Sequence, residues 1–166
     1  GVGFYKVGRL TVRDINGYGR LDLAGVLRKS SNVGAAKIGL KLGPEGIWSA
    51  YHSFGLAEPV GSGFPGEASG VMRHFTEWGE IATATSSYGY GLAVSALQLG
   101  RAYAALANDG QLRPLSLVRR DTPPETARQV VAAEHAQRVR HWLEGVVAPD
   151  GTARRAAVPG YRVAGK

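Results

Sequence analysis

Residues 86–110, SSYGYGLAVSALQLGRAYAALANDG, decide the fold of this chain. Ser95 and Gln98 have the spacing of a capping box, which predicts a helix that begins at Ser95. The sequence Asn-Asp-Gly supplies a stop, so we expect this helix to end at Asn108. Four residues at positions i, i+3, i+4 and i+7 predict one buried stripe along it: Leu99, Ala102, Tyr103 and Leu106.

Other segments carry similar local signals. Asp22 can cap a short helix through Leu27, and Ser31 or Asn32 can begin a second helix that Gly43-Pro44 stops. Further helices are predicted from Pro44 to Phe54 and, with an apolar stripe of Val139, Trp142, Leu143 and Val146, from Ala133 to Val147.

Extended segments are expected at both ends of the chain. Residues 1–20 are predicted to be short strands around the turn signal Asn16-Gly17, and residues 111–118 and 161–166 are also strand-like. Residues 56–82 are rich in Gly and Pro and predict a long irregular segment, a candidate binding edge. Pro123-Pro124 mark a polar loop. Together these elements predict an α+β fold with an incomplete sheet.

Composition excludes several classes of function. The chain has 166 residues and no cysteine, which excludes disulfides, thiol catalysis and cysteine-bound zinc. No apolar run approaches the roughly 18 residues of a membrane helix, and the first residues lack the apolar core of a signal peptide. The net charge of +7 is spread along the chain, which favours a basic surface over a nucleic-acid partner. The four histidines have no mutual ligand spacing, so no metal site is predicted.

Two short motifs carry possible chemistry. Ser30 and Asn32 form a Ser-x-Asn tripeptide at a predicted helix start, where the residues either cap the helix or supply a hydroxyl for proton shuttling and an amide that holds a substrate. Lys166 follows a strand-like segment and either points into solvent or places an ammonium beside a cleft. Tyr88 and Tyr90 precede the helix at Ser95 and are equally compatible with a cleft and with the core.

The order of these segments resembles one family. Ser-x-Asn, then YGYGL with the long helix, then PGYRVAGK is similar to class B penicillin-binding proteins, the D,D-transpeptidases of peptidoglycan synthesis, and most of all to their division-specific type. The resemblance covers residues 9–166. It implies a penicillin-binding protein and serine β-lactamase-like transpeptidase fold that is incomplete, with the helical subdomain and part of the antiparallel sheet, in one partial domain over residues 1–166.

The resemblance also implies roles for individual residues. Ser30 and Asn32 match the family's Ser-x-Asn motif, and Lys166 matches the lysine of its Lys-Ser/Thr-Gly motif. Tyr88 and Tyr90 are expected to contact substrate. Glu67 is expected to hydrogen-bond its own loop.

The family's nucleophile motif is missing from this chain. No serine is followed by a lysine three positions later, and in the family that Ser-x-x-Lys motif lies upstream of Ser-x-Asn. We therefore expect the chain to be a piece of a longer protein and to show neither transpeptidase activity nor covalent penicillin labelling by itself.

For the longer protein, the resemblance implies acyl transfer between peptidoglycan stem peptides, with inhibition by β-lactams and no cofactor. It also implies an anchor in the inner membrane, a periplasmic location and contacts with other division and cell-wall synthesis proteins. Two alternatives stay open. One is a serine β-lactamase or penicillin-sensing domain of the same fold, and the other is a basic binding module for an anionic polymer, without chemistry.

Overall fold

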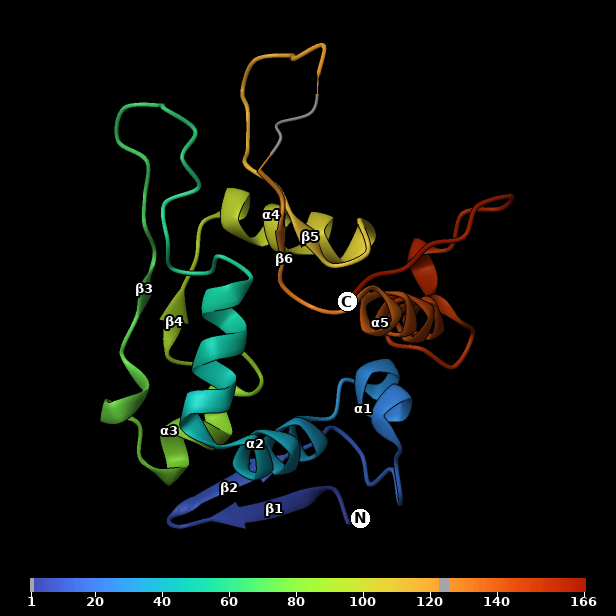
Figure 1. Ribbon diagram of the computed structural model, residues 1–166. Coiled ribbons are helices and arrows are strands. Elements are labelled where there is room, and N and C mark those ends of the chain that lie inside the picture. Colours follow the sequence, from blue (N-terminus) through green and yellow to red (C-terminus); the bar gives the residue numbers. More distant parts are fainter. Residues whose placement is uncertain (1, 123–125) are drawn as a thin grey trace.

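The computed structural model describes residues 2–122 and 126–166, and the predicted loop at Pro123-Pro124 lies outside these residues. It is a mixed α and β structure in which helices predominate (Figure 1). The helices are α1 (Leu23–Lys29), α2 (Asn32–Ser53), η1 (Phe75–Glu77), α3 (Glu80–Ser86), α4 (Ala96–Ala107), α5 (Ala133–Val147) and η2 (Arg154–Ala156). The strands are β1 (Phe4–Val7), β2 (Leu10–Arg13), β3 (Val71–Met72), β4 (Leu92–Ala93), β5 (Gln111–Leu112) and β6 (Arg128–Gln129).

The strands form three separate antiparallel pairs, β1–β2, β3–β4 and β5–β6. The first pair is a hairpin that turns at Gly8-Arg9, with Val7 opposite Leu10. The predicted turn at Asn16-Gly17 is therefore wrong. The tight turn needs a residue with positive φ next to the last strand pair, and Gly8 supplies it at φ 54°.

The hairpin covers the main hydrophobic core. Val7 and Val12 lie on one face of it and pack against Ala36 of α2 and Ala84 of α3. Tyr5 and Leu10 pack against the same cluster, since alternate residues of paired strands share a face. This core holds the hairpin, α2 and α3 together. The residues that directly follow β2 are therefore rigidly supported.

Helices α1 and α2 begin as the sequence predicts. The side chain of Asp22 accepts a hydrogen bond from the Gly25 amide at 2.7 Å, and Ser31 accepts one from the Gly34 amide at 2.8 Å. The expected stop at Gly43 is a kink inside one continuous element, because Gly43 has φ 78° and Pro44 begins the next turn. The predicted starts of α1 and α2 and the predicted break at Gly43 are confirmed, whereas α1 ends at Lys29 and not at the predicted Leu27.

Helix α4 has the predicted capping box but buries a different face. Ser95 accepts from the Gln98 amide and the Gln98 side chain accepts from the Ser95 amide. The buried residues are Gln98, Ala102 and Ala105, whereas Leu99 and Tyr103 are 47% and 40% exposed. The predicted stripe is thus wrong for Leu99 and Tyr103. Helix α4 packs against α5 and β5, and this packing, not the apolar pattern alone, selects the buried face.

Helix α5 shows the predicted stripe and ends before Pro149. Leu143 and Val146 are buried, and Val139 and Trp142 are half-buried. Helix α5 packs against α1 and α4, as Figure 1 shows. None of the helices in the described ranges is long and apolar enough to cross a membrane.

Two strand predictions are wrong. Only Gln111 and Leu112 of the expected strand 111–118 pair with a neighbour, because Pro114 lacks the amide hydrogen that a ladder needs. Residues 161–166 pair with no strand in the described part of the chain. Their backbone hydrogen bonds run from Tyr161 to Val158 and from Gly165 to Leu143 of α5.

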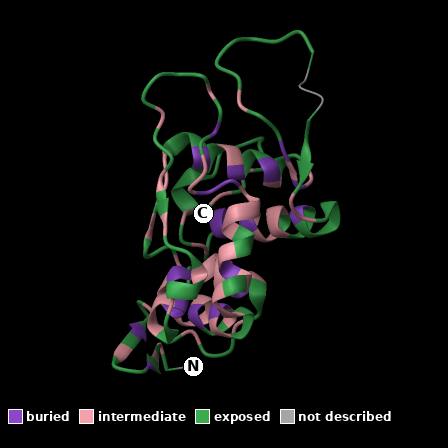
Figure 2. Ribbon diagram, turned by 60° about the vertical axis from the view of Figure 1, so that its left-hand side comes forward, coloured by how far each residue is buried: buried purple, intermediate pink, exposed green. Residues whose placement is uncertain are grey.

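Two long loops leave the helical body. They lie between α2 and β3 and between β5 and β6, and both project in the same direction in Figure 1. Figure 2 shows most of their described residues exposed, while the buried residues lie mainly in the helices, with others in the strands and in the first loop. The irregular segment predicted for residues 56–82 is confirmed for its first half and contains β3, η1 and the start of α3 in its second.

Candidate active site

Ser30 and Lys166 lie together although 136 positions separate them in the sequence. Lys166 Nζ donates a hydrogen bond to Ser30 Oγ at 2.7 Å. Ser30 sits between α1 and α2 in the left-handed region, with φ 53° and ψ 47°. A serine there is strained, and such strain gathers at functional sites. The structure therefore joins two residues that the sequence motifs only suggested separately.

The chain segment that carries Lys166 is attached to helix α5. The amide of Gly165 donates to the carbonyl of Leu143 at 3.3 Å, which ties the segment to α5. Burial lowers the pKa of the Lys166 ammonium below its ordinary value. A lysine with a lowered pKa and a serine hydroxyl in contact can exchange a proton more readily than a fully solvated pair.

Asn32 is the first residue of α2 and is exposed. Its side-chain amide donates to the carbonyl of Arg13 at 3.4 Å, a long hydrogen bond to the end of β2. Its Oδ1 has no partner within residues 2–122 and 126–166. The side chain is thus oriented by the hairpin and still has an acceptor for an incoming amide.

The residue between Ser30 and Asn32 is buried. Ser31 is only 4% exposed, and its hydroxyl donates to Asp14 Oδ2 at 2.6 Å. The other carboxylate oxygen of Asp14 accepts from the Val33 amide at 3.0 Å. Asp14 follows β2, and no local pattern in the sequence points to it, because its partners lie 17 and 19 positions away.

The residues before Ser30 are fastened on the other side. Lys29 Nζ donates to the backbone carbonyl of Asp150 at 2.7 Å and to its carboxylate at 3.2 Å, and Arg28 lies 3.6 Å from the same carboxylate. The hydrogen bond from Lys29 is the main cause that lowers the pKa of Asp150. These are exposed ion pairs, which contribute little stability individually. They join the end of α1 to the turn after α5.

Tyr88 and Tyr90 lie apart from this cluster. Their rings contact each other edge to face, with centroids 5.7 Å apart. Tyr88 packs against the hairpin core, and burial raises the pKa of its hydroxyl, while Tyr90 is 68% exposed. In the described ranges, no hydrogen bond links either tyrosine to Ser30, Asn32 or Lys166.

Glu67 organises the first long loop. Its carboxylate accepts hydrogen bonds from the amides of Val60, Gly61 and Ser62 and from the Ser62 hydroxyl. The Ser62 hydroxyl is the main cause that lowers the pKa of Glu67. The predicted structural role of Glu67 is confirmed, since one side chain replaces the backbone partners that this irregular loop lacks.

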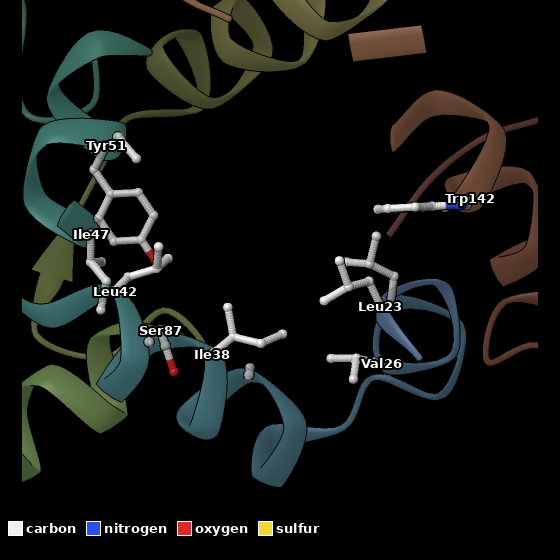
Figure 3. Close-up of a pocket in the computed structure, with 12 residues that line it drawn as sticks. Leu23, Val26, Ile38, Leu42, Ile47, Tyr51, Ser87 and Trp142 are labelled. Carbon is white, nitrogen blue, oxygen red and sulfur yellow. The ribbon is translucent and has the colours of Figure 1, made fainter. Parts of the chain in front are cut away.

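An apolar cavity of about 330 Å³ opens between α1, α2 and α5. In Figure 3, Leu23 and Trp142 face Ile47 and Tyr51 across it, with Ile38 at its floor. Its lining contains no nucleophile with a neighbouring base, and the Tyr51 hydroxyl is occupied by a hydrogen bond to the Ser86 carbonyl at 2.6 Å. The contact between Ser30 and Lys166 lies outside this lining.

Ligands for a metal do not gather anywhere in residues 2–122 and 126–166: no group of three or more His, Asp or Glu side chains could hold an ion. Two of the histidines contact other groups. His52 stacks on Trp48 and lies 3.0 Å from Glu58, and His74 packs edge-on against the same tryptophan.

Comparison with known proteins matches this architecture and motif order. The family model described as penicillin binding protein transpeptidase domain matches residues 5–166. The chain is 41% identical over 162 residues to a probable peptidoglycan D,D-transpeptidase PenA of Neisseria gonorrhoeae, covering 98% of this chain and 28% of that protein. It is 39% identical over 160 residues to the peptidoglycan D,D-transpeptidase FtsI of Escherichia coli K12, covering 96% of this chain and 27% of that protein.

A solved structure gives the same result. The transpeptidase domain of penicillin-binding protein 3 from Burkholderia pseudomallei superposes with a TM-score of 0.95 at 46% sequence identity, over all of this chain and 50% of that one. The chain thus spans little more than a quarter of these two curated relatives and half of this structure. The fold predicted from the motifs is confirmed, and the chain belongs to the penicillin-binding protein transpeptidase domain family.

Proposed function

We propose that this chain is part of a single transpeptidase domain in a longer protein, called the complete protein below, that cross-links peptidoglycan by serine acyl transfer. The observation that carries the proposal is the hydrogen bond from Lys166 to Ser30, next to Asn32, whose side-chain nitrogen is hydrogen-bonded and whose Oδ1 is available as an acceptor. The names of PenA and FtsI, both peptidoglycan D,D-transpeptidases, support the same reaction.

The chemistry needs a nucleophile that this chain does not contain. A serine from another segment attacks the carbonyl carbon of the penultimate D-Ala, the C–N bond breaks, and the terminal D-Ala leaves with a proton. An amine of a second stem peptide then attacks the ester, and the serine recovers its hydrogen. Ser30 is proposed to relay these protons, because its hydroxyl already contacts a titratable group.

Lys166 and Asn32 are proposed to bind the substrate peptide. The ammonium of Lys166 suits the terminal carboxylate, and the free Oδ1 of Asn32 suits a backbone amide. Tyr90 is proposed to contact the stem peptide farther from the reacting bond, because its ring is exposed and Tyr88 supports it from the core side.

The motif resemblance extends the proposal to the setting. The complete protein is proposed to be anchored in the inner membrane, to face the periplasm and to act at division with other cell-wall synthesis proteins. β-Lactams are proposed to acylate its serine, because they resemble the D-Ala–D-Ala peptide. Neither a nucleic acid nor a cofactor takes part.

The test is labelling of the complete protein with a fluorescent penicillin, followed by mapping of the labelled peptide. We expect one labelled serine in a Ser-x-x-Lys motif outside residues 1–166 and no label on the 166-residue chain by itself. Lys166→Ala and Ser30→Ala are each expected to slow acylation at least about tenfold. Lys41→Ala, an exposed lysine of α2, is the matched control and is expected to acylate at the unmodified rate.

Three results would contradict the proposal. Label on a serine of the 166-residue chain would place the nucleophile within it. Lys166→Ala with unchanged acylation would remove the pair that carries the proposal. Rapid turnover of the β-lactam by the complete protein would indicate a β-lactamase of the same fold, since a transpeptidase releases the penicilloyl group slowly.

A further inference from the structure

We propose that Asp14 is a positioning residue of this site, which holds the Ser30–Asn32 motif in place through Ser31 and Val33. The inference rests on the proposed function and assigns a role to a residue that no family motif covers. Its basis is that both carboxylate oxygens of Asp14 are hydrogen-bonded to the motif or to the residue that follows it.

Asp14 stands on a rigid support. It follows β2 directly, and its own amide donates to the Gly3 carbonyl at 2.9 Å, which extends the hairpin pairing by one step. Val7 and Val12 anchor the hairpin in the main core. The carboxylate therefore has little freedom to follow its partners if they move.

The two oxygens of Asp14 act on different groups. Oδ2 accepts a hydrogen bond from the buried Ser31 hydroxyl, and Oδ1 accepts one from the Val33 amide. The Ser31 hydroxyl in turn accepts the Gly34 amide. Val33 and Gly34 would otherwise leave two amides of the first turn of α2 unsatisfied, and a negative charge there is favoured by the helix dipole.

The geometry fixes the residue in between. Asn32 lies between the two residues that Asp14 holds, so its backbone cannot shift without breaking one of these bonds. Asn32 also donates to Arg13, the neighbour of Asp14, so one strand end orients all three residues. Ser30 precedes the same clamp. A misplacement of about 1 Å at such a group can slow a reaction about a hundredfold.

An ordinary helix cap would stabilise α2 without affecting the chemistry, and the experiment separates the two roles. Asp14→Asn in the complete protein keeps the size of the side chain and one acceptor. It places an N–H group where Ser31 now donates, so the hydroxyl proton loses its acceptor. We expect the rate of acylation by saturating fluorescent penicillin to fall at least about tenfold.

The control is a carboxylate of the same kind elsewhere. Asp109 accepts from Arg140 at 2.9 Å at the end of α4, and Asp109→Asn likewise exchanges one carboxylate oxygen for an N–H group. Asp109→Asn also removes a hydrogen-bonded carboxylate oxygen but is expected to leave the rate of acylation unchanged, whereas Asp14→Asn is expected to slow it.

A second variant reaches the same contact from the other side. Ser31→Ala removes the hydroxyl, and we expect it to slow acylation as well. Ser31→Ala also removes the acceptor of the Gly34 amide, but both changes break the shared Ser31–Asp14 hydrogen bond. The double variant Asp14→Asn/Ser31→Ala is therefore expected to acylate no more slowly than the slower of the two single variants. This non-additivity is a readout that a general loss of stability would not produce.

The outcomes distinguish this inference from the proposed function. If the unmodified complete protein is not labelled by penicillin, the proposed function fails and the role of Asp14 falls with it. If the unmodified protein is labelled, two results would show that only the role of Asp14 is wrong. One is that Asp14→Asn and Ser31→Ala acylate at the unmodified rate. The other is that the double variant slows acylation by the product of the two single effects.

Discussion

Gln98 fastens α4 to the first long loop, and its replacement should destabilise the domain more than most polar substitutions. The side chain is fully buried. Its Oε1 accepts from the Ser95 amide at 2.7 Å, and its Nε2 donates to the carbonyls of Glu58 and Ser69 at 2.6 and 2.8 Å. One amide group therefore joins the helix start to both sides of the loop that Glu67 organises.

The expected magnitude follows from these three hydrogen bonds. Each contributes about 1 kcal/mol net to folding, so Gln98→Ala should lower the free energy of unfolding by about 3 kcal/mol. Two of the three are the bonds that Nε2 donates to the carbonyls of Glu58 and Ser69. For a domain of about 150–250 residues, 3 kcal/mol corresponds to a fall in midpoint of about 6–12 °C.

The variant Gln98→Glu distinguishes the contribution of the two hydrogen bonds that Gln98 donates from that of the one it accepts. The carboxylate keeps the shape and the bond from Ser95, but an oxygen replaces the nitrogen that now donates to Glu58 and Ser69. Burial beside these two carbonyls, which repel a negative charge, raises the pKa of such a carboxyl above its unfolded value. The stability of this variant should therefore be greatest below the unfolded pKa, about 4.3, and should fall as the pH rises through the folded pKa.

The assay is thermal unfolding of the transpeptidase domain in the complete protein, followed by near-UV circular dichroism. Gln137→Ala is the control, because Gln137 is an exposed glutamine on α5, and it should change the free energy of unfolding by at most about 0.5 kcal/mol. If Gln98→Ala costs less than about 1 kcal/mol, or if the stability of Gln98→Glu does not change with pH, the three hydrogen bonds of Gln98 do not stabilise the domain as expected.

Three further outcomes are expected. Glu67→Gln should speed amide hydrogen exchange at Gly61 and Ser62, because the Glu67 carboxylate protects both amides. In the unmodified protein, the protection of these amides should be complete above the ordinary carboxyl pKa and should be lost as the pH falls through the lowered pKa of Glu67. Equal exchange rates in both proteins would contradict this. Gly39→Ala should cost about 1–3 kcal/mol, because its Cβ would lie 2.5 Å from Ser87 Cβ, whereas Gly46→Ala meets nothing closer than 3.4 Å and should stabilise α2 by about 0.5–1 kcal/mol; urea unfolding that shows the same sign for both would be inconsistent with this packing. Acylation of the complete protein should decline at alkaline pH with an apparent pKa below the ordinary lysine value, since burial lowers the pKa of Lys166, and a pH profile without this limb would show that the ammonium is not needed.

Much of this molecule could be predicted because the signals are local. The caps at Asp22 and Ser31, the capping box of α4 and the break at Gly43 each involve residues within four positions, so neighbours in the sequence determine them. The order of the motifs was enough to predict the family and its fold, which the comparisons confirm.

The sequence failed where the answer depends on what an element packs against. Helix α4 offers two apolar faces, and its packing in the fold buries the one with Ala102 and Ala105, whereas Leu99 and Tyr103 are exposed. The hairpin turns at Gly8 because the pairing of β1 with β2 buries Val7 and Val12 on one face. Residues 161–166 have the composition of a strand, but a strand exists only with a partner.

The site divides in the same way. The sequence by itself determined that Ser30, Asn32 and Lys166 are the residues to consider, since each belongs to a short motif. Only the tertiary structure decided that Lys166 donates to Ser30 and that Asp14 holds Ser31, because the chain must fold back over 136 and 17 positions to form these contacts. No local pattern encodes contacts between residues so far apart in the sequence. These contacts result from the packing of α5 on α1 and of the hairpin on α2.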